Sequence, residues 1–462
     1  MRSAAREWTD SFVVLLTDAG KLWWALAAKL IMILTVSWSA SRVLQLSASA
    51  VGIMIPSQEW EINTEAGAFD ANLRTVAVWN QWLGIVLTSV SLLVLLVGLI
   101  LCLRALGDHL GRRSEGFAAN AAQPSLAHVL SLSLLAFLGI YSVFDEIGEI
   151  VNRIVSDSVI LARDPSIYMF VPLNPTTLEQ GLVVLGVLTA AFVLRRIAEG
   201  RADKTGNRVL GVISTVLESF YLFAFFIVGR GLILRLQSWF AYREAAAWLK
   251  DALDWLGTPL RWLAASLPEA FGAAWAWFWD AGWPVVLSSF MQPLLWLALG
   301  TLVLGSGIRS FRDLLESGDL RASLSRRLPR AQRAVKATET IERHSTAARR
   351  LQTVVLGDVD DKYLPIWRSL RLVLRCGVGL LGAFVVLFAL IELLDAWIGY
   401  GLVVLVGWRD FSTEQFIGDF ENLFRYVLIM SAKLCLITAV YAIAFRAVPA
   451  TAPDGSDAEV AA

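Results

Sequence analysis

Long apolar runs recur along the whole chain and alternate with polar connections, and this alternation is the feature that most restricts the fold. A helix rises about 1.5 Å per residue, so roughly 20 apolar residues cross the hydrocarbon core of a bilayer. Inside that core every backbone amide needs an internal partner, which runs of this length obtain by forming helices. The sequence therefore predicts an all-α integral membrane protein, folded as a polytopic helical bundle.

We expect about eight transmembrane helices in this bundle. Composition agrees, because 56% of the residues are hydrophobic and 17% are charged, whereas soluble proteins carry about 25% charged residues. The predicted limits of the spans are 22–46, 78–103, 126–144, 181–194, 209–234, 284–308, 370–394 and 423–445. The fourth run is short and needs residues from its flanks to reach across a membrane.

One strongly basic segment fixes the predicted orientation. From Arg309 to Arg371 the chain carries 14 Lys/Arg against eight Asp/Glu. Connections rich in Lys and Arg stay in the cytoplasm. With eight spans, the cytoplasmic connections and their flanks hold 27 basic residues and the outer connections hold 8. We therefore expect a multi-pass protein of the cell (inner) membrane with both termini in the cytoplasm.

The same pattern divides the chain into five parts. The apolar parts alternate with polar ones, and the last part is rich in small and acidic residues, which predicts disorder. The parts are an amphipathic N-terminal lead-in (1–21), a six-span membrane region (22–308), a basic helical cytoplasmic insert (309–368), a two-span membrane region (369–446) and a tail (447–462).

A tryptophan-rich outer segment, 235–283, carries a heptad pattern in which Trp248, Trp255 and Trp262 occupy equivalent positions. On a helix these positions and the leucines beside them form one broad apolar face. An oligomer seam or a substrate vestibule would use such a face. Pro259 interrupts the heptads, however, which favours short amphipathic helices lying in the outer membrane interface with indoles at headgroup level.

Charged side chains inside the apolar runs are the candidate functional residues. Glu218 and Lys433 each lie roughly 14 to 15 Å from a membrane surface if their helices are regular. Such charges face the bundle interior and require a partner or water. Their equal depth makes them candidate partners for each other, with Lys29 as the alternative partner for Glu218. Lys29 and Arg42 lie near the two ends of the first run, where they can snorkel to the headgroups.

No catalytic, nucleotide or metal motif emerges from the sequence, so an enzyme is not the favoured hypothesis and no cofactor is expected. The acidic run 358–361 lacks the glycine and the distal acid of a calcium loop, and helix capping explains it. The three cysteines all fall inside apolar runs, where no disulfide pairing can be predicted, and the three histidines lie far apart without the spacing of metal ligands. They are Cys102, Cys376, Cys435, His109, His128 and His344.

Two functions fit these features. Ionisable residues at mid-membrane depth favour the movement of an ion or a small solute. The alternative is a non-catalytic membrane scaffold that organises lipid or partner proteins, favoured by the tryptophan-rich face and the basic insert. The lipid bilayer is the expected partner, an anionic lipid or a cytoplasmic protein could bind at 309–368, and no nucleic acid is expected. The sequence leaves the oligomeric state and the solute open.

Overall fold

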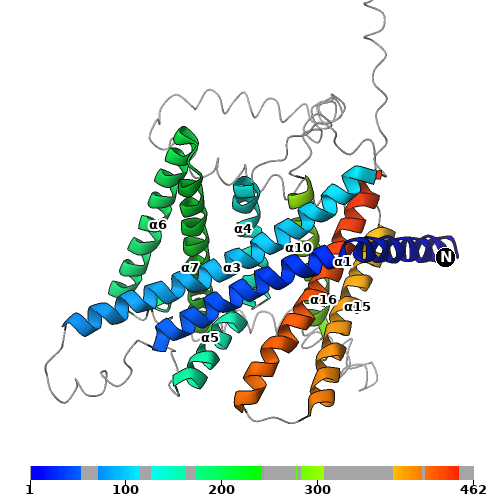
Figure 1. Ribbon diagram of the computed structural model, residues 1–462. Coiled ribbons are helices and arrows are strands. Elements are labelled where there is room, and N and C mark those ends of the chain that lie inside the picture. The colour runs from blue at the N-terminus through cyan, green and yellow to red at the C-terminus, as the bar shows by residue number, and fades with distance from the viewer. Residues whose placement is uncertain are drawn as a thin grey trace, which may run out of the picture.

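The computed structural model describes a bundle of helices, and no strand occurs among the described residues (Figure 1). The described residues are 2–53, 71–113, 126–144, 146–162, 170, 172–175, 177–241, 243, 277, 282–305, 378–407 and 411–446. Their helices are α1 (Arg2–Ile53), α3 (Ala71–Arg113), α4 (Leu126–Val143), α5 (Glu146–Ala162), α6 (Leu178–Thr205), α7 (Arg208–Ala241), α10 (Trp283–Gly305), α15 (Val378–Val406) and α16 (Phe411–Arg446).

Six of these helices are long and apolar enough to cross a membrane, namely α1, α3, α6, α7, α15 and α16. The prediction of an all-α membrane protein is therefore confirmed at this level. The predicted spans 126–144 and 284–308 coincide with α4 and α10, whose apolar stretches are shorter, Ser133–Val143 and Ser289–Leu304. The count of eight spans stays a prediction.

Helix α6 shows how local sequence sets the ends of a span. Its N-cap is Thr177, whose hydroxyl accepts a hydrogen bond from the Gln180 amide while the Gln180 side chain accepts one from the Thr177 amide. This reciprocal capping satisfies two amides that the first turn would leave open. At the other end Gly206 adopts φ 64°, the left-handed conformation that glycine reaches without strain. The helix thus recruits the flanking residues that the short predicted run required.

Helices α1 and α15 are among those that extend further than predicted. Helix α1 runs without a break through Gly20, so the N-terminal lead-in and the first span form one helix. Helix α15 continues to Val406, about three turns beyond the predicted end at residue 394. Glu392 and Asp395, which lie at the predicted end of that span, consequently lie within the helix. Their partners on α16, described below, remove the need for either carboxylate to reach water.

The core lies where α1 meets α3 and α16. In Figure 1, α1 and α3 run side by side across the molecule and α16 crosses them more steeply, with α15, α5 and α10 around them. Leucines of α1 and α3 are completely buried between them, for example Leu34 and Leu96. Gly98 of α3 lies so close to Ser37 of α1 that an added Cβ would be 2.2 Å from the Ser37 hydroxyl. Helices α6 and α7 instead form a hairpin at one side of the bundle.

Several predictions fall on other parts of the chain. The heptad residues Trp248, Trp255 and Trp262, the basic insert 309–368 and the tail 447–462 lie outside the described residues. The interfacial location of the heptads, the cytoplasmic location of the insert and the disorder of the tail therefore stay predictions.

Candidate functional site: a charged cavity in the bundle

Helix α5 presents a stripe of charged residues to the bundle. Glu146, Glu149, Arg153 and Asp157 are spaced three or four residues apart, the spacing that places side chains on one face of a helix. The rest of α5 is largely apolar, so this stripe is its only strongly polar face. Helix α5 is not among the six candidate spans, yet it packs against α1 and α4 inside the assembly.

Helix α1 presents a matching polar stripe to α5. Trp38, Ser41, Arg42, Gln45 and Ser49 again recur every three or four residues. The Ser49 hydroxyl donates a hydrogen bond to the Ile154 carbonyl across the contact, at 3.1 Å. A polar face on each helix therefore meets the other, and the apolar faces remain for packing.

Arg42 is the most extensively bonded of these residues. Its guanidinium donates to both carboxylate oxygens of Asp157, at 2.5 and 2.8 Å, and its Nε donates to Asp419 of α16 at 2.9 Å. The Arg42 and Asp157 side chains are 6% and 1% exposed. Arg42 thus joins three helices in the interior, and the prediction that it snorkels to the headgroups is wrong. A bidentate partner and a second carboxylate offset the loss of water.

Two ion pairs link α15 to α16. Lys433 donates to Glu392 at 2.7 Å, and Arg425 binds Asp395 through two hydrogen bonds of 2.9 and 2.8 Å. Gln292 of α10 also donates to Glu392, at 3.4 Å. Lys433 therefore finds the partner that its depth demands, but that partner is Glu392. The hypothesis that Lys433 pairs with Glu218 is not supported, because the structure gives each residue a different partner.

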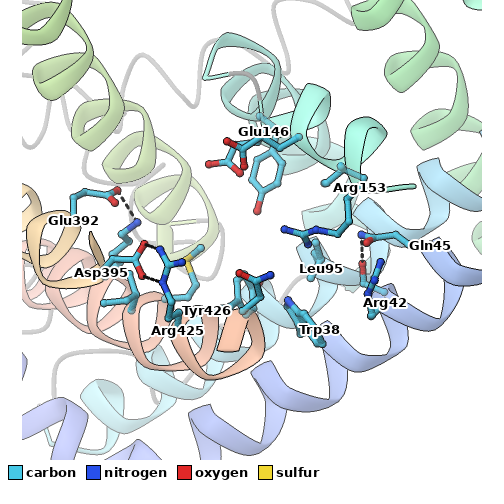
Figure 2. A pocket seen from close by; sticks show the side chains of 18 of the residues that line it. Trp38, Arg42, Gln45, Leu95, Glu146, Arg153, Glu392, Asp395, Arg425 and Tyr426 are labelled. Carbon is cyan, nitrogen blue, oxygen red and sulfur yellow. Dashed lines mark hydrogen bonds and ion pairs between the residues drawn. The ribbon is translucent and has the colours of Figure 1, made fainter. Parts of the chain in front are cut away.

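These groups surround a cavity of about 300 Å³, shown in Figure 2. Side chains from α1, α3, α4, α5, α10, α15 and α16 line it. Aromatic walls are supplied by Trp38, Tyr141, Trp296 and Tyr426. Its charged lining residues are Arg42, Glu146, Glu149, Arg153, Glu392, Asp395, Arg425 and Lys433. Four cations and four anions thus share one small space between apolar helices.

Not all of the lining charges are paired. Among the described residues, Glu146, Glu149 and Arg153 make no ion pair with any other side chain. Burial, followed by the neighbouring Glu149 carboxylate, raises the pKa of Glu146, and the nearby Lys433 opposes this only in part. Burial and the neighbouring Arg42 guanidinium lower the pKa of Arg153. Both directions mean that the charged form of each group lacks full compensation.

Two uncharged polar atoms at the cavity also lack partners among the described residues. The Gln45 side chain is 3% exposed and donates to Ser41 at 3.4 Å, but its Oε1 accepts no hydrogen bond. The Tyr426 hydroxyl is likewise buried without a hydrogen bond. A buried polar group without a partner is costly, so water or a ligand in the cavity is the expected source of the missing hydrogen bonds.

Glu218 belongs to a different place, the α6–α7 hairpin. Its carboxylate lies 3.3 Å from the Arg195 guanidinium, and the two side chains are 3% and 2% exposed. Glu199, one turn along α6, lies 3.4 Å from the same guanidinium. Lys29, the alternative partner predicted for Glu218, is exposed on α1. Of the three predicted intramembrane residues, the cavity contains Lys433 alone.

The sequence contained signals for the residues that the prediction missed. The spacing of three and four along α5 and along α1 could have identified one polar face on each helix. Glu392 and Asp395 share such a spacing as well. The spacing could not predict which polar faces contact each other, because that depends on which helices touch.

Among the described residues, no group of three or more His, Cys, Asp or Glu side chains is arranged to hold a metal ion. The chain matches no protein-family model, and comparison with curated proteins and with solved structures yields no significant match. The fold and the cavity define a helical membrane protein with an internal charged site. Its function is inferred from that site.

Proposed function

We propose that the protein moves an ion or a small solute across the membrane, and that the cavity between α1, α5, α10, α15 and α16 forms part of the pathway. The observation that supports this proposal is the gathering of eight charged side chains around an open space among apolar helices. Ionisable groups within a membrane bundle are costly, and where they occur they mark ion and solute pathways.

The state of the charges favours transport over a purely structural role. A structural ion pair needs each charge to be closely matched, because an unmatched buried charge costs several kcal/mol. Arg42, Arg425 and Lys433 are matched in this way. Glu146 and Arg153, both half-buried, are not matched, and neither is Glu149, which is exposed; all three line the cavity. Charges without an ion-pair partner at the cavity can bind an ion or solute that crosses the membrane.

Orientation is part of the proposal. We place both termini and the insert 309–368 in the cytoplasm of a cell whose inner membrane holds the protein, and we assign anionic lipid or a cytoplasmic protein as the partner of the insert. A reporter fused after Arg330 should be cytoplasmic and one fused after Trp255 external. Either reporter on the opposite side would overturn this orientation.

Flux through purified protein in liposomes tests the proposal. Liposomes with and without protein are compared for proton, potassium and chloride leakage with ion-sensitive dyes, and for solute uptake by osmotic swelling. We expect at least one flux to depend on the protein and to fall in the Lys433→Met variant, provided that the variant elutes as a folded particle. No protein-dependent flux for any probe would favour the scaffold alternative and contradict transport.

A further inference from the structure

The unmatched charges of the cavity have both signs and come from one helix. Glu146, Glu149 and Arg153 all project from the polar face of α5 into the same space. Figure 2 shows the Arg153 guanidinium extending into the space between Glu146 and Tyr426. The other lining charges have ion-pair partners: Lys433 pairs with Glu392, Arg425 pairs with Asp395, and Arg42 pairs with Asp157 and Asp419 outside the lining. The α5 residues therefore leave one positive group and two carboxyl groups available to a solute.

Glu149 and Arg153 are four residues apart, with the acidic residue first, which is the arrangement that favours a pair along a helix. No such pair forms between them among the described residues. Both groups line the cavity, further apart than an ion pair. A molecule that carries a cation at one end and an anion at the other could bridge this gap.

A solute of a single charge fits this site less well. A simple anion bound by Arg153 would lie near two carboxyl groups, and a simple cation bound by Glu146 and Glu149 would lie near Lys433 and Arg153. Like charges at such distances cost free energy in a low-dielectric interior. A molecule with both charges gains at each end, and pairing at both ends offsets the cost of removing its two charges from water.

The remaining lining residues suit a small polar molecule. Trp38 and Trp296 present indole rings, which can pack against an alkyl chain or an ammonium group. The buried Gln45 Oε1, which accepts no hydrogen bond, can accept one from a solute. The volume of about 300 Å³ lies at the lower end of small-molecule pockets, which measure about 300–1,000 Å³.

We infer that the cavity binds a small zwitterion, with its ammonium group between Glu146 and Glu149 and its carboxylate on Arg153. This inference rests on the proposed function, because it assigns the class of solute to the same cavity. Amino acids of short chain length and their ω-amino homologues have this chemistry.

Isothermal titration of the full-length protein in detergent tests the inference. The probes are glycine, β-alanine and 4-aminobutyrate, which differ in the distance between the two charges, with acetate and ethylammonium as molecules that carry one charge each. We expect at least one zwitterion to bind at least about tenfold more tightly than either single-charge molecule. Equal binding of acetate or ethylammonium, or no binding of any zwitterion, would overturn the inference.

Variants assign the two ends. Arg153→Gln and Glu149→Gln should each weaken zwitterion binding at least about tenfold, and Arg153→Lys should keep more affinity than Arg153→Gln because it keeps the charge. Arg201→Gln and Glu179→Gln make the same changes at exposed positions of α6 and should bind as the wild type does. Size-exclusion profiles and melting curves show whether each variant is folded. Unchanged binding in folded Arg153→Gln protein would contradict the assignment.

The binding and flux experiments can contradict the inference and the proposed function independently of each other. If liposomes show protein-dependent flux of another ion while no zwitterion binds, the inference fails and the proposed function stands. If a zwitterion binds as described but nothing crosses the liposome membrane, the proposed function fails and the cavity is a binding site without transport.

Discussion

The α6–α7 hairpin and the cavity region both bury charges between apolar helices, but they do so in different ways. In the hairpin, Glu218 meets Arg195 directly and both side chains are almost completely buried. In the cavity region, charges from α1, α5, α15 and α16 surround an open space, and three of them have no ion-pair partner among the described residues. We call the hairpin pair closed, because its charges contact each other directly, and the cavity cluster open, because its charges surround a space.

The comparison teaches that depth in the membrane does not by itself distinguish structure from function. Glu218 and Lys433 were equally good candidates by depth, yet Glu218 takes part in a pair that holds two neighbouring helices together, whereas Lys433 lines a cavity. What distinguishes the two residues is that Lys433 lies beside a cavity, whereas Glu218 lies in a closely packed pair. A closed pair should affect stability alone, and an open cluster should affect stability and flux.

The largest effect on stability is expected at Arg42, which neutralises two carboxylates at once. Arg42→Met removes the bidentate guanidinium from the buried Asp157 carboxylate and should cost about 3–5 kcal/mol in the free energy of unfolding. Unfolding in mixed detergent and SDS measures this loss. The double variant Arg42→Met/Asp157→Leu should be more stable than Arg42→Met, because it removes the uncompensated charge. Strictly additive losses would show that the pair does not act as a unit.

A smaller loss is expected in the hairpin. Glu218→Gln removes one carboxylate from Arg195, but Glu199 remains 3.4 Å from the same guanidinium. We expect a loss of about 2–3 kcal/mol in the free energy of unfolding, with flux per folded protein unchanged. The same unfolding and liposome measurements apply. Loss of flux in stable Glu218→Gln protein would remove the proposed distinction between the two regions.

Close packing provides a comparison without charges. Gly98→Ala places a methyl group 2.2 Å from the Ser37 hydroxyl and 2.5 Å from its Cβ, so α1 and α3 must move apart. We expect a loss of about 1–2 kcal/mol from overpacking. Gly186→Ala on α6 has nothing within 4 Å of the new methyl group. It should gain a few tenths to about 1 kcal/mol because alanine favours helix. Equal effects at both positions would contradict the described α1–α3 contact.

The smallest expected effect is a change in pH dependence at Glu146. Burial raises the pKa of this carboxyl group above its value in the unfolded chain. The folded protein therefore holds the proton more tightly, and the associated stability is present at low pH and lost as pH rises through the raised pKa. Glu146→Gln should lack this part of the decline in melting temperature as the pH rises above the ordinary carboxyl pKa of 4.5.

The control for this measurement is Glu179→Gln, which removes an exposed carboxyl group from the first turn of α6. Its profile of melting temperature against pH should follow that of the wild type. If Glu146→Gln also follows the wild type at every pH, then Glu146 does not titrate differently in the folded protein.

Hydropathy alone predicted the all-helical membrane fold, because runs such as 78–103 admit few other structures. It also located Lys433, since a charge in the middle of an apolar run must face the interior. The partner of Lys433 was missed for a physical reason. Glu392 and Asp395 follow an apolar stretch, where acidic residues ordinarily mark the end of a span. Only the cations on the neighbouring helix allow those acids to remain inside.

The role of α5 could be predicted in part. The spacing of Glu146, Glu149, Arg153 and Asp157 indicates one polar face, but a polar face is as typical of a helix lying against water as of one facing a cavity. The matching stripe on α1 meets it because of how the chain packs, which depends on contacts far apart in the sequence. Helix spacing therefore identifies candidates, and tertiary contacts select among them.

The most direct test exchanges one ion pair in each region for apolar residues without changing the net charge. Glu392→Leu/Lys433→Met does so in the cavity, and Arg195→Met/Glu218→Leu does so in the hairpin. Flux through liposomes is measured for both double variants and normalised to folded protein. The cavity variant should lose most of its flux and the hairpin variant should keep it. Equal flux in the two variants would contradict the claim that the cavity carries the function.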